Sequence, residues 1–138
     1  MGKIRSSMKI IKDKITIEEL KEMAKKMFGN LVKVVVDVEK EIMVVNGELH
    51  SDEEAFLIEK GSKPKNLWGI NIYPEIVDEA KASSPSSLPS ESSIKDENWI
   101  EFDSVINLKP HFGNRTRGVD NSEIKEKIIK IVNKLVEK

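Results

Sequence analysis

Hydrophobic positions near the start of the chain recur with the period of an α-helix. Between residues 15 and 29 apolar side chains return every three or four positions, which predicts an amphipathic helix. Thr16 and Glu19 match a capping box at its start, and Gly29 can end it in the left-handed conformation. This stretch therefore predicts one helix with both ends defined.

Two further segments show helical signals. Ser51 and Glu54 form a second capping-box pattern, which predicts a short helix that stops at Gly61. Near the C-terminus, Asp120 and Glu123 are predicted to cap a last helix. The buried stripe of that helix is predicted to be Ile124, Ile128, Ile131, Val132 and Leu135.

Runs of β-branched residues predict the strands. Residues 31–38 (LVKVVVDV) and 41–45 (EIMVV) are expected to form two antiparallel strands or one long bent strand, and the uninterrupted valines indicate a central position. Residues 66–74 (NLWGINIYP) and 99–110 (WIEFDSVINLKP) alternate apolar and polar side chains, which predicts two more strands. Residues 8–12 (MKIIK) are an edge-strand candidate.

The order β-α-β-β-α-β-β-α predicts an α+β fold, with an antiparallel or mixed sheet of about five strands and helices packed on one face. Residues 8–138 are expected to form a single domain. Within it, residues 75–98 contain seven serines and two prolines, which predicts a flexible surface loop. Residues 1–7 are interpreted as an N-terminal extension, natural or left by cloning, with Met8 as a candidate native start.

Composition narrows the class of protein. With 38% hydrophobic and 34% charged residues, the 138-residue chain is typical of a soluble globular protein, and no apolar run is long enough to span a membrane. The absence of cysteine excludes thiolate chemistry and disulfides, and it favours a cytoplasmic location. Abundant Lys, Glu and Ile without any Gln are typical of proteins from hot environments.

Charge argues against nucleic acid as a partner. The net charge is −1, whereas binding through phosphate neutralisation usually shows as a basic excess. The lysines of the last helix stand four residues after acidic ones, as in Glu123/Lys127 and Glu126/Lys130, which is typical of a solvated helix face.

Several segments resemble a small family of uncharacterised prokaryotic proteins, a domain of unknown function. They are VVDVEKEIMVVNGELHSDEEA, LWGINIYPE, EFDSVINLKP and GNRTRGVD. With the first and last helices, they cover nearly all of the chain from Met8 except the serine-rich loop, which looks like an insertion relative to the family. The resemblance implies a single domain and no established activity.

The first candidate site is the loop NLKPHFGNRTRGVDN at residues 107–121. Arg115 and Arg117 precede a predicted helix N-terminus, and guanidinium groups and helix N-termini both favour anions. Asn107 and Asn114 would add hydrogen-bond donors, and the polar sheet face could join the site through Asp103 and Asn71. The alternative is that the arginines pair with the protein's own carboxylates.

The second candidate site contains His50 and Asp52, to which Asp103 and His111 could be added by the fold. Such a set could bind a metal or place a general base beside an acid. The spacing matches no helical metal motif, and acidic residues in the first turn of a helix are also explained by the helix dipole.

No catalytic signature is present, so the first hypothesis is a non-catalytic binding module, expected to be a homodimer. It would hold a small anion or an anionic partner at residues 107–120. The alternative is a metal-assisted hydrolase or phosphoesterase that uses His50, Asp52, Asp103 and His111. No cofactor is predicted. A purely structural protein would instead have both arginines buried in ion pairs.

Overall fold

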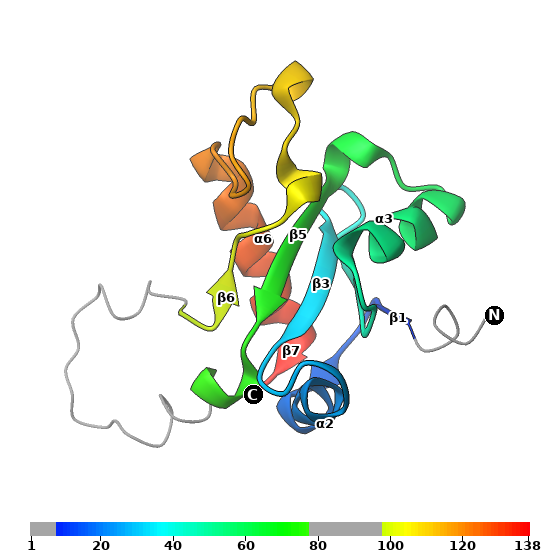
Figure 1. The fold of residues 1–138 in the computed structure, drawn as a ribbon, viewed down its shortest axis with the longest axis vertical. Helices are drawn as coiled ribbons and strands as arrows, with labels where there is room; N and C mark the ends of the chain where they lie inside the picture. Colours follow the sequence, from blue (N-terminus) through cyan, green and yellow to red (C-terminus); the bar gives the residue numbers. More distant parts are fainter. Residues whose placement is uncertain (1–7, 78–97) are drawn as a thin grey trace.

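A five-stranded antiparallel sheet forms the centre of the computed structural model, which describes residues 8–77 and 98–138 (Figure 1). The strand order is β1-β4-β3-β5-β6. The α+β class and the five-stranded sheet agree with the prediction from the sequence. The strands are β1 (Lys9–Ile11), β4 (Ile42–Val45), β3 (Val32–Asp37), β5 (Leu67–Ile72) and β6 (Ile100–Glu101).

The central position of β3 explains its uninterrupted valines. Val34 and Val36 point into the larger hydrophobic cluster, whereas Val35 points into a second cluster on the opposite face. All three are fully buried. Since alternate residues of a strand face opposite sides, a strand covered on both faces favours apolar side chains at successive positions, as in Val34–Val36.

Helices cover both faces of the sheet. Helices α2 (Ile17–Met27) and α6 (Ser122–Leu135) contribute to the larger cluster. Helix α3 (His50–Glu59) lies on the other face, where Leu57 packs with Val35 and Val44 (Figure 1). The prediction that the helices pack on one face of the sheet is therefore wrong, because α3 covers the opposite face. A short parallel pair, β2 (Ile15–Thr16) and β7 (Val136–Glu137), joins the start of α2 to the end of α6.

The capping box of the first helix is confirmed, because the Thr16 side chain accepts from the Glu19 amide and Glu19 bonds back. The predicted caps of the other two helices are wrong. Helix α3 begins one residue before Ser51, with Leu49 at its N-cap and no side-chain cap. Helix α6 is capped by Asn121, because the neighbouring Asp120 carboxylate is occupied by the Arg115 amide and the Thr116 hydroxyl.

The predicted strand over residues 99–110 is also wrong from Phe102 onward. Strand β6 ends at Glu101, and two 3-10 turns follow, η2 (Val105–Asn107) and η3 (Pro110–Phe112). The Ser104 hydroxyl caps η2 by accepting from the Ile106 amide. Asn and Pro are poor strand residues, so this segment leaves the sheet edge and packs beside β5 and α3.

Two predicted segments fall largely on residues that the structure does not describe. The N-terminal extension and nearly all of the serine-rich loop, residues 78–97, lie outside the described ranges. In those ranges no helix is both long and apolar enough to cross a membrane.

Glu53 is a fully buried acid on the sheet-facing side of α3. Its Oε2 accepts from the Gly47 amide at 2.8 Å, and its Oε1 has no partner among the described residues. Burial raises the pKa of this carboxyl well above its ordinary value, which favours the protonated form. A Cβ at Gly47 would lie 2.5 Å from Glu53 Cγ, so only glycine fits there.

This burial predicts a pH-dependent stability. Because the pKa is raised on folding, the contribution of Glu53 to the free energy of unfolding is complete below the ordinary carboxyl pKa and is lost as pH rises through the folded-state pKa. We expect Glu53→Gln to remove this loss and to raise the melting temperature at pH 8 more than at pH 4. The exposed Glu18→Gln variant is the matched control, and equal effects of both variants would contradict the assignment.

Candidate functional site

The loop between β6 and α6 is attached to β5 by the side chain of Asn107. Its Oδ1 accepts from the Gly69 amide at 2.8 Å, and its Nδ2 donates to the Gly69 carbonyl at 3.0 Å. The same Nδ2 donates to the Arg117 carbonyl at 2.7 Å. Asn107 is fully buried, so its amide continues the hydrogen bonding of β5 where β6 has ended.

Gly69 permits this close attachment because it has no side chain. A Cβ built at Gly69 would lie 2.6 Å from Ser104 Cβ and 3.1 Å from His50 Cγ. Any larger residue would therefore push the loop away from the sheet. The glycine within the predicted strand 66–74 thus marks the contact between β5 and the loop.

Asn114 fixes the other half of the loop. Its Nδ2 donates to the carbonyls of Asn107, Thr116 and Gly118, at 2.8, 3.1 and 2.8 Å. Its Oδ1 accepts from the Asp120 amide at 2.7 Å. Both asparagines proposed from the sequence as ligand donors are therefore occupied by the protein's own backbone, and they act as a scaffold.

The two arginines have different surroundings. Arg117 Nε donates to Asp103 Oδ1 at 2.6 Å, and both side chains remain about half exposed. The Arg115 side chain is exposed, and its guanidinium has no hydrogen bond or ion pair with any described residue. The Asp120 pKa is lowered by its hydrogen bonds from Thr116 and Arg115, and to a smaller extent by the positive charge of Arg115. Of the predicted anion-binding groups, Arg115 is thus the one that remains available.

A polar cluster adjoins the Arg117–Asp103 pair on the sheet. Glu101 Oε1 accepts from Asn71 Nδ2 at 3.0 Å and from the Tyr73 hydroxyl at 2.8 Å. Partial burial and this hydrogen bond raise the Tyr73 pKa to about 12, so the phenol remains protonated. Asn71 is buried under this cluster, and its Oδ1 has no partner among the described residues.

The metal-binding candidates do not come together. His50 is buried, and its Nε2 bonds the Ile70 carbonyl at 2.8 Å. Asp103 pairs with Arg117, and the exposed His111 lines a separate hollow with Phe112. Across residues 8–77 and 98–138, no three His, Asp or Glu side chains are grouped closely enough to hold a metal ion.

The loop also exposes apolar side chains that the sequence pattern did not single out. Val105, Leu108 and Phe112 are 61%, 44% and 61% exposed, and we call them the apolar tip. Val105 lies on η2, which packs beside β5, Leu108 follows it, and Phe112 lies on η3, the turn that projects at the top of Figure 1. Leu108 and Phe112 line a hollow of about 320 Å³, and its other lining residues are Glu54, Pro64, Ile106, Lys109, Pro110 and His111.

The apolar tip was missed because the alternation of apolar and polar side chains over residues 99–110 predicted a regular strand instead of turns. The signal that could have revealed it is the pair Asn107 and Pro110, since both residue types interrupt strands.

The comparisons with known proteins identify the family. Residues 9–135 match a family profile described as a protein of unknown function, DUF5674. The chain belongs to this family. The match extends from β1 to the end of α6, which confirms the resemblance to a domain of unknown function. No curated protein and no solved structure matched the chain, so membership of the DUF5674 family assigns no activity.

His50 predicts a second pH dependence, opposite in sign to that of Glu53. The Ile70 carbonyl can only accept, so Nε2 carries the proton of the neutral ring, and burial lowers the His50 pKa from 6.5 to about 4. This contribution to stability is present above pH 6.5 and is lost as pH falls through 4, by about 3 kcal/mol in all. His50→Gln should remove this loss in urea unfolding at pH 4 and 7. The matched control is His111→Gln, at the exposed histidine, and an unchanged acid loss in His50→Gln would refute the assignment.

Asn107 predicts a structural effect in the loop. Asn107→Ala leaves the buried Gly69 amide and carbonyl without their partner, which should cost about 2 to 4 kcal/mol in the free energy of unfolding. Asn133→Ala removes a half-buried amide that donates to one carbonyl within α6, so it should cost less. Urea unfolding of both variants tests the difference. Equal losses in the free energy of unfolding would contradict the role of Asn107 in holding the loop to β5.

Proposed function

We propose that the protein is a non-catalytic binding module whose recognition surface is the loop between β6 and α6. One observation carries the proposal: the apolar tip is exposed on a loop that Asn107 fixes to β5 and that Asn114 braces from within. Exposed side chains on a rigid loop need little ordering when a partner binds, which favours recognition.

The apolar tip contributes little to folding in the isolated chain. Phe112 and Val105 are 61% exposed, and Leu108 is 44% exposed. Covering a large apolar side chain completely is worth about 1.5 to 3 kcal/mol, so a partner that covers three of them could gain substantial affinity. Leu108 and Phe112 line the same hollow, and neighbouring exposed apolar side chains often mark an interaction surface.

The hollow beside the apolar tip suggests the chemistry of the partner. At about 320 Å³ it is at the small end of ligand sites, and an aliphatic or aromatic side chain would fit among Leu108, Pro110 and Phe112. Lys109 lines it but is occupied, since its Nζ donates to the Ile106 carbonyl at 2.7 Å. Arg115 and Arg117 are the exposed arginines of the same loop, and Arg117 is paired with Asp103, so Arg115 is the cation better placed to meet a partner.

These features support one kind of binding partner, a protein segment in which an apolar side chain stands next to an acidic or phosphorylated side chain. The apolar side chain would enter the hollow, and the anionic group would bind Arg115 through its planar guanidinium. The proposal thus keeps the anionic partner inferred from the sequence and adds an apolar side chain to it. Arg117 would take part only by leaving Asp103.

A peptide selection tests the proposal. Random twelve-residue peptides are selected against the full chain, and the binders are titrated while amide NMR shifts are recorded. We expect binders that combine an aromatic or aliphatic residue with Asp or Glu, and shifts centred on residues 105–115. Phe112→Ser should weaken binding about tenfold or more, and Arg115→Gln about two- to fivefold with a weaker salt dependence.

Phe28→Ser is the matched control, because Phe28 is also exposed, at 41%, but lies at the end of α2. Binders that shift other residues, or that bind Phe112→Ser as tightly as the wild type, would overturn the proposal. Sedimentation of the same proteins tests the expected homodimer. A wild-type dimer that becomes a monomer in Phe112→Ser would identify the partner as a second copy of this chain.

A further inference from the structure

Lysines from two distant parts of the chain meet at a hollow beside the β3–β4 turn. Lys63 and Lys65 flank Pro64 at the turn η1 (Pro64–Asn66), and Lys127 lies on α6. Together with Val38, Glu39 and Asn66 they line a hollow of about 320 Å³. All three lysines are exposed.

The one carboxylate in this hollow already has a partner. Glu39 Oε1 accepts from Asn66 Nδ2 at 2.8 Å. The backbone of Asn66 is held on both sides, because its amide donates to the Lys63 carbonyl at 2.9 Å and its carbonyl accepts from the Val38 amide at 3.0 Å. The lining therefore carries three positive charges and one negative charge, on a floor that hydrogen bonds hold in place.

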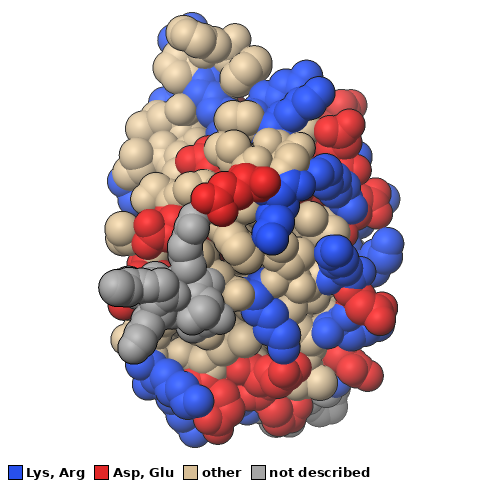
Figure 2. All heavy atoms as spheres, turned by 90° about the vertical axis from the view of Figure 1, so that its right-hand side faces the viewer, with Lys and Arg blue, Asp and Glu red and all other residues tan. Residues whose placement is uncertain are grey.

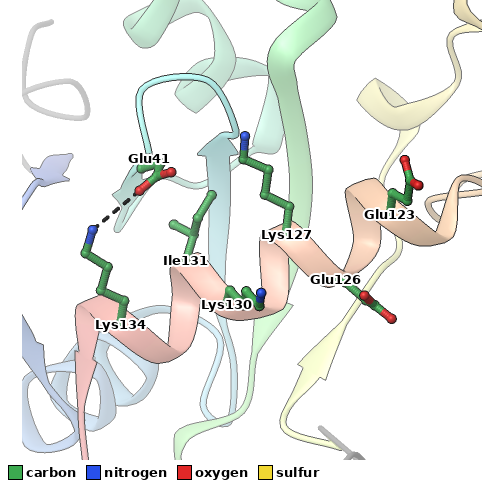
Figure 3. A pocket seen from close by; sticks show the side chains of 7 residues that line it. All are labelled: Glu41, Glu123, Glu126, Lys127, Lys130, Ile131 and Lys134. Atoms are coloured by element: carbon green, nitrogen blue, oxygen red, sulfur yellow. Dashed lines mark hydrogen bonds and ion pairs between the residues drawn. The ribbon is translucent and has the colours of Figure 1, made fainter.

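None of the three lysines forms an ion pair with a carboxylate of the described residues. The sequence predicts that Lys127 pairs with Glu123, four residues earlier. In the described part of the chain, however, the ion pairs with N–O distances up to 4.0 Å are Lys9–Glu19, Arg117–Asp103 and Lys134–Glu41. Figure 3 shows Lys127 directed from α6 toward the β3–β4 turn and away from Glu123.

The adjoining hollow differs in charge. It measures about 520 Å³ and shares Lys127, but its lining has as many acidic as basic side chains, and Lys134 pairs with Glu41 at 3.4 Å (Figure 3). Mixed charge is also seen on the face in Figure 2, where basic side chains gather over one half with acidic ones between them. Of these two hollows, the one lined by Lys63, Lys65 and Lys127 therefore has the excess of positive charge.

We propose that this hollow, which we call the lysine hollow, binds a compact anion with two or more negative charges, namely a chain of adjacent phosphates. Ammonium groups act as point charges that suit phosphate oxygens and need no planar fork. A single carboxylate would leave most of the positive charge without a counter-charge, whereas a diphosphate or triphosphate could contact all three lysines. The lysine hollow is separate from the apolar tip and does not depend on the function proposed for it.

Calorimetric titration of the full chain tests this inference. The probes are inorganic triphosphate and ATP without metal ions, with acetate as the singly charged comparison, at low and physiological salt. We expect saturable binding of triphosphate that weakens with salt, and no saturable binding of acetate. The triple variant Lys63→Gln/Lys65→Gln/Lys127→Gln should bind triphosphate about tenfold more weakly.

The triple variant Lys12→Gln/Lys25→Gln/Lys26→Gln is the matched control, because it removes the same charge from exposed lysines elsewhere. Equal binding of triphosphate and ATP would indicate that the phosphates alone are recognised, and binding of ATP only would identify a nucleotide. The inference fails if neither probe saturates, or if both triple variants weaken binding equally. That failure would leave the Phe112 experiment unaffected.

Discussion

Two hydrogen bonds between the Asn107 side chain and the Gly69 backbone determine how the chain is arranged between β6 and α6. Strand β6 pairs with β5 only at Asn71 and Ile72, so the remaining edge of β5 would otherwise expose unpaired amides and carbonyls. Asn107 satisfies Gly69, and Ser104 and Asn114 then fold the chain back toward α6. The apolar tip projects because this anchor turns the chain away from the sheet.

The face of the sheet that α3 covers contains buried polar and ionisable side chains. The face toward α2 and α6 is almost entirely apolar, whereas the α3 face includes buried His50, Glu53 and Asn71 beside a small apolar cluster. Glu53 is favoured in its protonated form and His50 in its neutral form, which lets both be buried without a counter-ion. The stability of this face therefore responds to pH in two opposite senses.

Several residues that the sequence offered as site residues serve the protein's own structure. The groups that might have bound a substrate are used to hold the loop, as with Asn107 and Asn114, or are paired, as with Arg117. What remains open to a partner is the apolar tip with Arg115, and on another side the lysine hollow. Each could contribute to binding without any change in the packed core, since the side chains concerned are mostly exposed.

Local signals in the sequence were sufficient for the elements that depend on them. The Thr16–Glu19 box set the start of α2, and the run Val34–Val36 indicated a strand buried on both faces, because capping and side-chain alternation act between near neighbours. Contacts within the 107–121 loop, and contacts between residues far apart in the chain, decided the rest. Asn121 caps α6 in place of Asp120, because the Asp120 carboxylate accepts hydrogen bonds from the Arg115 amide and the Thr116 hydroxyl. Asn107 became a scaffold because folding brought Gly69, 38 residues earlier, within hydrogen-bond distance. A side chain's partners, and hence what it leaves free for a ligand, are set by tertiary packing that no local pattern contains.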